Sequence, residues 1–417
     1  MAIVRDGLSV TQCRVWTAVA CLLTVHLAGC GGSNSSASNS SVPVSPPTGS
    51  ILQPTTIDLY PVTSAADGNR LFVMVTAVGS KPVNMPLAFD TGSSGITLYA
   101  PDIFPSSMVT SKGFVFAPGQ TSLTYDGITV TNQAATRKYG SPTTGRSQTG
   151  NIGFAQVTFG DAAGQLVTDV MPVFLYYLIT DNLTGQPQPP PNQRGWFGVD
   201  AAPGLVAAAG STEPATGYPA CALGTLGGCY VVSVLKYLHY ASGLDGGFIL
   251  KPATLQSCDI TLAGSCAPGR VLTVGLDNSV ETGFSMVNLN CPPTGYSGPG
   301  SINGYTVCQA GIPDTTVTVS GSANGVLAGT VLFDSGTPSV VLNAPTGAVF
   351  PTNVLAGASV MVVTPSGFTY DYTAGAGSDV TDTQVQSGSN VQSIVGIGYF
   401  TTNSFLIDYT TATEGWK

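Results

Sequence analysis

The chain has 417 residues, of which 43% are hydrophobic and only 8% are charged, with 52 glycines and 29 prolines. An average soluble domain carries about 25% charged residues, so this composition excludes a coiled coil and a chain kept unfolded by charge. The 13 Lys and Arg against 22 Asp and Glu give a net charge of −9 without a basic run, and we expect no nucleic acid partner. Two histidines, His26 and His239, are too few for a multi-histidine metal centre, and we expect no metal and no cofactor.

Residues 1–29 have the pattern of a signal peptide. Two arginines precede an apolar run over residues 15–25, which is too short for a permanent membrane span. The run ends in Leu27-Ala28-Gly29-Cys30, which resembles a bacterial lipobox. The resemblance implies lipidation of Cys30 and a lipid-anchored protein of the bacterial cell envelope, at the outer membrane since no Asp follows the cysteine. The alternative is an ordinary secretory signal with an incidental cysteine.

After the signal peptide, residues 30–55 are mostly Gly, Ser, Asn and Pro, which predicts a flexible tether. From about residue 56, short runs of Val, Thr, Ile, Tyr and Phe alternate with Gly, Pro, Asn and Asp, as in chains of many short strands. We predict strands at 70–78, 127–131, 156–159, 247–250, 315–319 and 359–363. One amphipathic helix is predicted over Tyr230–Tyr240, with apolar residues at 231, 234, 235 and 238. The predicted fold class is therefore all-β.

Six cysteines follow Cys30, in three pairs that are close in sequence. The pairs are Cys221 with Cys229, Cys258 with Cys266, and Cys291 with Cys308. An even number in an exported chain predicts disulfides, and nearest-neighbour pairing is our choice among about 15 connectivities. Zinc binding is the competing interpretation, but no CxxC spacing or nearby histidine supports it.

Two segments of the chain share one pattern. Residues 87–98 read LAFDTGSSGITL and residues 331–342 read VLFDSGTPSVVL, so that each has an apolar run, Asp-Thr/Ser-Gly and a second apolar run. In this composition about 0.5 copies of the bare tripeptide are expected by chance, and one copy could be a simple turn. Two copies with the same flanks favour a shared site formed by Asp90 and Asp334.

Paired carboxylates can perform hydrolysis without a metal or a histidine. Two aspartates brought close together cannot both ionise easily, so the pair holds one proton. The charged partner can take a proton from water while the protonated partner polarises a carbonyl group. Gly92 and Gly336 allow tight turns, and the hydroxyls of Thr91, Ser335, Ser93 and Thr337 can hold the loops and the carboxylates.

With these motifs the chain resembles the pepsin-like aspartic peptidases. The resemblance implies an all-β, bilobal fold of two pseudo-twofold-related, barrel-like lobes, at 56–253 and 254–417. Tyr139 resembles the tyrosine of the flap hairpin that closes over substrate. Trp196-Phe197-Gly198-Val199 and the segment 394–400 resemble the strands that lie beside the two aspartate loops.

The resemblance implies an aspartic endopeptidase that acts on polypeptides as a monomer, with Asp90 and Asp334 catalytic. Some positions depart from the family pattern: residues 97–99 read Thr-Leu-Tyr where Trp is usual, Ile397 stands where Asp is common, and Pro142–Gln148 lengthen the flap. These departures leave a second hypothesis open, a non-catalytic lipoprotein that binds envelope polypeptides or glycans in the same groove. An isolated histidine such as His239 is interpreted as a packed or surface residue.

Overall fold

The computed structural model describes residue 51 and residues 53–417 apart from short gaps. The gaps are 65–67, 141–144, 162–163, 210–217, 226, 294–295, 297, 321–324, 347–349, 351–353, 355, 378 and 389–391. The predicted signal peptide, Cys30 and most of the tether lie outside the described residues and stay predictions. Part of the lengthened flap, 141–144, also lies outside them.

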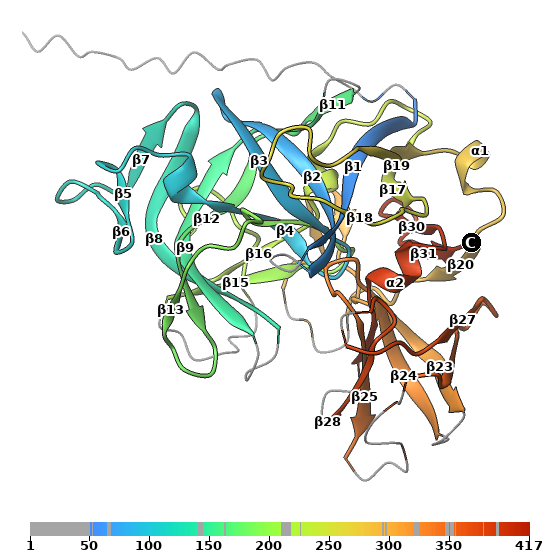
Figure 1. Ribbon diagram of the computed structural model, residues 1–417. Coiled ribbons are helices and arrows are strands. Elements are labelled where there is room, and N and C mark those ends of the chain that lie inside the picture. The colour runs from blue at the N-terminus through green and yellow to red at the C-terminus, as the bar shows by residue number, and fades with distance from the viewer. Residues whose placement is uncertain are drawn as a thin grey trace, which may run out of the picture. The chain divides into compact units, whose positions relative to one another are not determined.

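The described residues form two β-rich lobes and a group of strands that joins them (Figure 1). The predicted all-β, bilobal fold is confirmed. The predicted strands all lie within observed strands or overlap them. The lobe boundary at 253/254 stays a prediction.

The first lobe contains the first aspartate motif at the end of a long antiparallel pair, β2 with β3. Its elements are β2 (Gly68–Val78), β3 (Lys81–Asp90), β4 (Ser94–Tyr99), η1 (Ala100–Asp102), β5 (Val109–Thr110), β6 (Gly113–Phe114), β7 (Ser122–Tyr125), β8 (Ile128–Tyr139), β9 (Arg146–Ala155), β10 (Val157–Asp161), β11 (Gly164–Val167), β12 (Met171–Asp181), β13 (Pro187–Gln188), β14 (Trp196–Val199), β15 (Gly204–Ala208), β16 (Cys229–Val231) and η2 (Val234–Tyr237).

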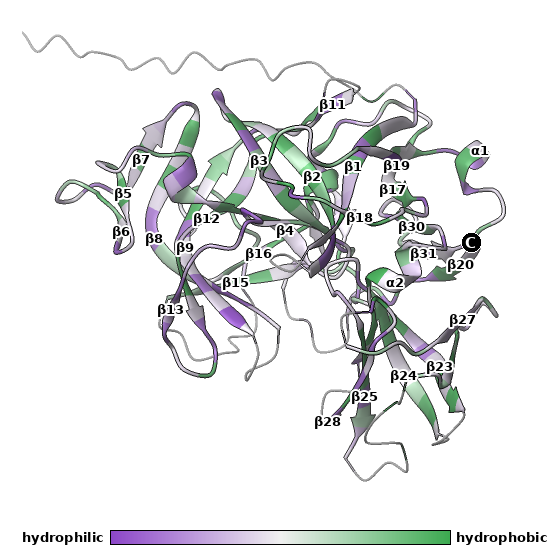
Figure 2. Cartoon of the chain, in the orientation of Figure 1, coloured by the Kyte–Doolittle hydropathy of each residue, from purple (hydrophilic) through white to green (hydrophobic). Residues whose placement is uncertain are grey.

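The second lobe is a seven-stranded sheet in the order β27-β26-β23-β24-β29-β25-β28. Its elements are β23 (Ile312–Ser320), β24 (Gly325–Phe333), β25 (Val340–Pro345), β26 (Ser359–Val363), β27 (Thr369–Thr373), β28 (Thr383–Gly388), β29 (Gln392–Val395) and α2 (Ile397–Phe400), with a separate hairpin of β21 (Ser301–Ile302) and β22 (Tyr305–Thr306). From Thr315 to Ser320, buried residues of β23 alternate with half-buried or exposed ones, as expected for a sheet with one face on the core. Figure 2 shows the hydropathy of the same residues along the strand.

The joining strands combine the two ends of the chain with its middle. They are β1 (Thr55–Ser64), β17 (Asp245–Leu250), β18 (Gln256–Ser257), β19 (Gly269–Leu276), β20 (Ser285–Asn288), β30 (Phe405–Asp408) and β31 (Thr413–Trp416), with the short helix α1 (Asn278–Glu281). In this group β19 pairs with both β1 and β17, and β17 pairs with β30.

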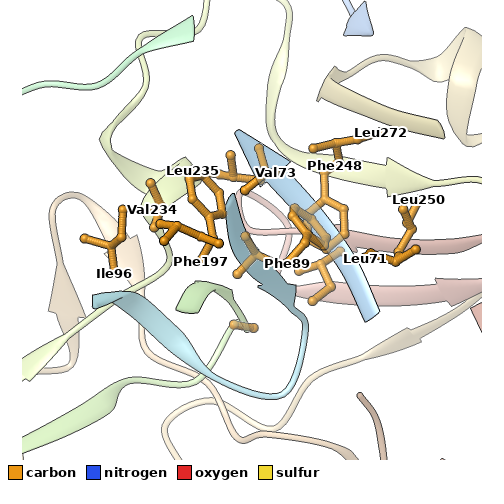
Figure 3. Packing of buried hydrophobic residues seen from close by; sticks show 14 of the residues in the cluster. Leu71, Val73, Phe89, Ile96, Phe197, Val234, Leu235, Phe248, Leu250 and Leu272 are labelled. Atoms are coloured by element: carbon orange, nitrogen blue, oxygen red, sulfur yellow. The ribbon is translucent and has the colours of Figure 1, made fainter. Parts of the chain in front are cut away.

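Aromatic packing fixes the strands that lead to the two motifs. Phe89, just before the first aspartate, stacks on Phe197 with ring centroids 6.1 Å apart and meets the edge of Phe248 at 5.7 Å (Figure 3). Phe333, just before the second aspartate, packs on Tyr399 at 4.8 Å. All these side chains are fully buried, so both loops start from rigid strands.

The predicted helix over Tyr230–Tyr240 is wrong. Cys229–Val231 instead form β16, which pairs with β15, and only Val234–Tyr237 form a single 3₁₀ turn capped by the Ser233 hydroxyl. Every residue of that turn is buried, including Lys236. The apolar residues at helical spacing are therefore part of a segment that is buried on all sides, and they do not mark one apolar face of a helix. The β-branched valines of this segment favour an extended chain.

The three disulfides have the predicted nearest-neighbour pairing, Cys221–Cys229, Cys258–Cys266 and Cys291–Cys308. Each closes a short loop, with sequence separations of 8, 8 and 17. The disulfides therefore cross-link residues that are close in sequence and stabilise irregular segments locally.

Candidate active site

The two aspartate loops meet, although 244 positions separate their motifs (334 − 90). Asp90 is the last residue of β3, and Asp334 directly follows β24. Their exposed fractions are 4% and 8%. A Cβ atom placed on Gly336 would lie 2.5 Å from Asp90 Oδ1 and 3.0 Å from Asp334 Oδ1, so the two carboxyl groups lie side by side.

Four hydrogen bonds join the loops in a reciprocal pattern. The Thr91 hydroxyl donates to the Phe333 carbonyl (2.7 Å), and the Ser335 hydroxyl donates to the Phe89 carbonyl (2.8 Å). In return, the Ser335 amide donates to Thr91 Oγ1 (2.9 Å) and the Thr91 amide to Ser335 Oγ (3.1 Å). Because each bond has its counterpart, the two loops are equivalent in their contacts.

Each carboxylate is also oriented by its own loop. Asp90 accepts a hydrogen bond from the Gly92 amide (2.9 Å) and one from the Ser93 hydroxyl (2.6 Å). Asp334 accepts the same two kinds of bond, from the Gly336 amide (2.7 Å) and the Thr337 hydroxyl (2.6 Å). The predicted supporting residues thus all contact the loops or carboxylates.

The glycines of the motifs provide the space for this approach. A Cβ atom on Gly92 would lie 2.4 Å from Asp334 Cγ, and one on Gly336 would lie 2.5 Å from Asp90 Oδ1. Each glycine therefore faces the carboxylate of the other loop, and any side chain there would push the aspartates apart.

Burial is the main reason why the pKa of Asp90 is well above its ordinary value, and the neighbouring charge and hydrogen bond of Asp334 add to it. The hydrogen bonds from Ser93 and Gly92 act in the opposite direction. The expected state near neutral pH is one proton held by the pair.

A segment that contains a glycine lies beside each loop. The first is β14, a strand as the resemblance implied. The second, 394–400, is a strand only at Ile394 and Val395, and Ile397–Phe400 form the short helix α2 instead. β14 runs parallel to β3, with Gly198 opposite Asp90, and the Asp334 amide donates to the Val395 carbonyl at the end of β29. A Cβ on Gly198 would be 2.6 Å from the Ser93 carbonyl oxygen, and one on Gly396 would be 2.0 Å from that of Ser339. At both positions a side chain would collide with a neighbouring backbone carbonyl group, so only glycine fits.

Tyr139 lies at the end of β8, in the hairpin with β9, and it faces the site. Its ring stacks on Trp196, with centroids 5.2 Å apart and an interplanar angle of 19°. Its hydroxyl lies beside Thr97 and close to Asp90, and burial raises its pKa to about 12. Trp196 is therefore the aromatic partner of Tyr139, whereas Tyr99 packs on Tyr176. The guanidinium of Arg70 lies 5.4 Å from the Trp196 ring and donates to the Gly336 carbonyl.

Sequence reasoning missed a further buried acid in the lining of the cleft, Asp200. Asp200 directly follows β14, and burial raises its pKa to about 7. Lys236, also buried, has its pKa lowered to about 8 by desolvation, against the opposing effect of Asp200. The position of Asp200 at the end of the strand predicted beside the first loop was the available signal.

A cleft of about 1540 Å³ lies at the pair. Both aspartates, Tyr139, Trp196 and Asp200 line it. This volume is larger than that of a usual small-molecule pocket and has room for an extended polymer.

Other predicted features lie elsewhere. His239 is exposed and contacts Asp169 at 2.7 Å, outside the cleft lining. Among the described residues, no cluster of His, Cys, Asp and Glu could hold a metal ion. In the same part of the chain, no helix has the length and hydrophobicity to cross a membrane.

No protein-family model and no curated protein matches the sequence. Among solved structures, the chain is similar to an aspartic proteinase from Irpex lacteus, with 16% identity, a TM-score of 0.48, and coverage of 86% of this chain and 96% of that one. It is also similar to Basic 7S globulin from soybean, with 9% identity, a TM-score of 0.47, and coverage of 88% and 96%. Functional assignment depends on the geometry of the aspartate pair.

Proposed function

We propose that the protein is an aspartic endopeptidase that hydrolyses peptide bonds with one water held between Asp90 and Asp334. The observation that carries the proposal is a pair of adjacent, buried carboxyl groups, held by two reciprocally bonded loops at a cleft. Such a pair needs no metal, cofactor or histidine.

In the proposed reaction the pair works as acid and base. The protonated carboxyl group of Asp90 donates its proton to the carbonyl oxygen of the substrate. At the same time Asp334 takes a proton from the water, and the water oxygen attacks the carbonyl carbon. The proton on Asp334 then passes to the peptide nitrogen, the C–N bond breaks, and Asp90 regains its proton as the new carboxyl group forms. Ser93 and Thr337 keep the carboxylates oriented throughout.

Proteolysis of an unbiased peptide mixture tests this proposal. The wild type should cleave peptides that the Asp90→Ala variant leaves intact, and a statine-type transition-state mimic should block the cleavage. Absence of cleavage at every pH from acid to neutral would remove the basis of the proposal.

The second candidate is a non-catalytic protein that binds envelope polypeptides or glycans in the cleft. It is favoured by Ile397, which is fully buried where the family often has Asp, and by the Thr97 replacement beside Tyr139. The wild type would then retain labelled polypeptide or glycan without cutting it, and Asp90→Ala would retain it equally well.

We also propose that the chain is a bacterial envelope lipoprotein anchored through Cys30, on the basis of the lipobox-like sequence. The expected result is that wild-type protein partitions into detergent with the membrane fraction, whereas Cys30→Ser is released. Equal partitioning of both forms would contradict the anchor.

A further inference from the structure

Three of the polar side chains that line the cleft are more than nine-tenths buried and have one polar atom without a partner; the less buried Tyr139 has such an atom as well. The three are Arg137 (6% exposed), Gln148 (5%) and Tyr176 (0%). Arg137 Nη1, Gln148 Oε1 and the Tyr176 hydroxyl have no hydrogen-bond partner among the described residues. Buried polar atoms are nearly always paired, so an unpaired group in the wall of a cleft leaves a hydrogen bond for a bound ligand or water to make.

Strand register places the three on one face of the sheet. Arg137 on β8 is directly opposite Gln148 on β9, and Tyr176 on β12 is opposite Gly150 on β9. Residues 148 and 150 are two positions apart and therefore point to the same face. Gly150 carries no side chain, so nothing from β9 separates Tyr176 from the Arg137–Gln148 pair along that strand.

The charge of Arg137 is not neutralised by a neighbouring acid. Its guanidinium donates to the Ser94 carbonyl (3.0 Å) and lies 5.3 Å from the Tyr139 ring. In the part of the chain that the structure describes, Arg137 forms no ion pair. A buried guanidinium with only neutral partners is costly and favours an anion.

We propose that Arg137, Gln148 and Tyr176 form a subsite that selects an acidic side chain of the substrate; this inference rests on the proposed peptidase function. A carboxylate accepts hydrogen bonds from the Arg137 guanidinium and the Tyr176 hydroxyl. The Gln148 amide, turned by 180°, donates its NH₂ group to the same carboxylate. A neutral or cationic side chain would leave the guanidinium unpaired.

The subsite adjoins the reacting centre. Arg137 is held by Ser94, in the strand that leaves the first aspartate loop, and Tyr139 lies two residues further along β8 beside Asp90. The acidic residue is therefore expected close to the bond that is cut.

Binding to a variant that cannot cleave separates this inference from the proposed function. The probes are fluorescein-labelled decapeptides with a central Phe-Phe, in which Glu, Gln, Leu or Lys is placed at each flanking position in turn. With the Asp90→Asn variant, a Glu peptide should bind about tenfold more tightly than its Leu and Gln counterparts at one position. Adding Arg137→Met should abolish that preference, and Tyr176→Phe should reduce it.

Arg270→Met is the matched control, because Arg270 is exposed and lies outside the cleft lining. It should keep the preference for Glu, and thermal unfolding should show that every variant is folded. If Arg137→Met does not fold, two other measurements test the subsite. The preference for the Glu peptide should be weaker in Tyr176→Phe, and it should disappear at a pH below the pKa of the glutamate side chain, where the carboxylate is protonated. Equal binding of Glu and Leu peptides at every position, or a preference unchanged in Arg137→Met, would overturn the subsite. Wild-type cleavage of the same peptides tests the peptidase function separately.

Discussion

Gly92 and Gly336 determine how closely the two carboxyl groups can approach. Each faces the aspartate of the opposite loop at a distance that leaves no room for a methyl group. The close approach of Asp90 and Asp334, and with it the shared proton, therefore depends on two residues that have no chemistry of their own.

Gly92→Ala is expected to reduce kcat about a hundredfold or more while the protein remains folded, because the new methyl group displaces the Asp334 carboxylate. Peptide cleavage and thermal unfolding measure the two effects. Gly300→Ala is the control, since a Cβ at Gly300 meets no atom within 4 Å. Full activity in Gly92→Ala would show that the close approach is unnecessary.

At the residue scale, the sequence predicted the aspartates and their hydroxyl partners because they form a repeated local motif. No role in the site was predicted from the sequence for Arg137, Asp200 or Trp196. Trp196 was noted only as part of an apolar strand, and its contact with Tyr139 spans 57 positions (196 − 139). Contacts of this kind depend on how β8 and β14 are placed in space, which no local pattern records.

At the element scale, the ends of β3 and β24 are joined by the reciprocal bonds of Thr91 and Ser335. These bonds connect the first lobe to the second at the site, and their atoms are buried. Breaking these bonds therefore lowers the free energy of unfolding, because it leaves buried backbone groups without hydrogen-bond partners.

Thr91→Val keeps the shape of the side chain but removes its hydroxyl. The Phe333 carbonyl and the Ser335 amide then lose their partners, and we expect the free energy of unfolding to fall by about 2–4 kcal/mol. Denaturant unfolding measures the loss. Thr124→Val, at an exposed position of β7 where the hydroxyl contacts only the exposed Thr129 hydroxyl (3.3 Å), should change stability by less than about 0.5 kcal/mol. Similar values for both variants would contradict the role of the reciprocal bonds.

Strands were predicted more successfully than the one helix for a physical reason. Short runs of β-branched residues between turn residues have few alternatives to an extended chain. The segment Tyr230–Tyr240 also has apolar residues at helical spacing, but it is buried on several sides, so the spacing carried no information about a single apolar face.

At the scale of the whole molecule, several carboxyl groups are buried in a fold with few cations. Burial raises the pKa of Asp90 and Glu414 well above their ordinary values, and that of Asp200 to about 7. The folded state therefore binds more protons than the unfolded chain between about pH 4 and pH 7. By linkage, stability is highest near the acidic end of this window and is lost as the pH rises through it.

We expect the melting temperature to be at least about 5 °C higher near pH 4 than near pH 7.5. Glu414→Gln, which stays neutral, should raise the melting temperature near pH 7.5 and leave it unchanged near pH 4. Asp259→Asn, at an exposed position, should show no such gain near pH 7.5. A melting temperature that increases from pH 4 to pH 7.5 would contradict this account.

The two-lobed architecture could be predicted only through the repeated motif and its resemblance to a family. Composition and strand patterns alone indicate many strands but not their order. The pairing of β1 with β19, for example, joins residues more than 200 positions apart, and only the closed structure determines it. Loops with their own chemistry were thus predictable, whereas the walls of the cleft were not.

The most direct test of the central claim is the rate at which an unfolded polypeptide is cleaved by the wild type, Asp90→Asn and Asp334→Asn, measured from acid to neutral pH. We expect cleavage by the wild type and a loss of about a thousandfold or more in the rate of each variant, with the fold retained. Equal rates in the wild type and either variant, or no cleavage by the wild type at any pH, would contradict the central claim.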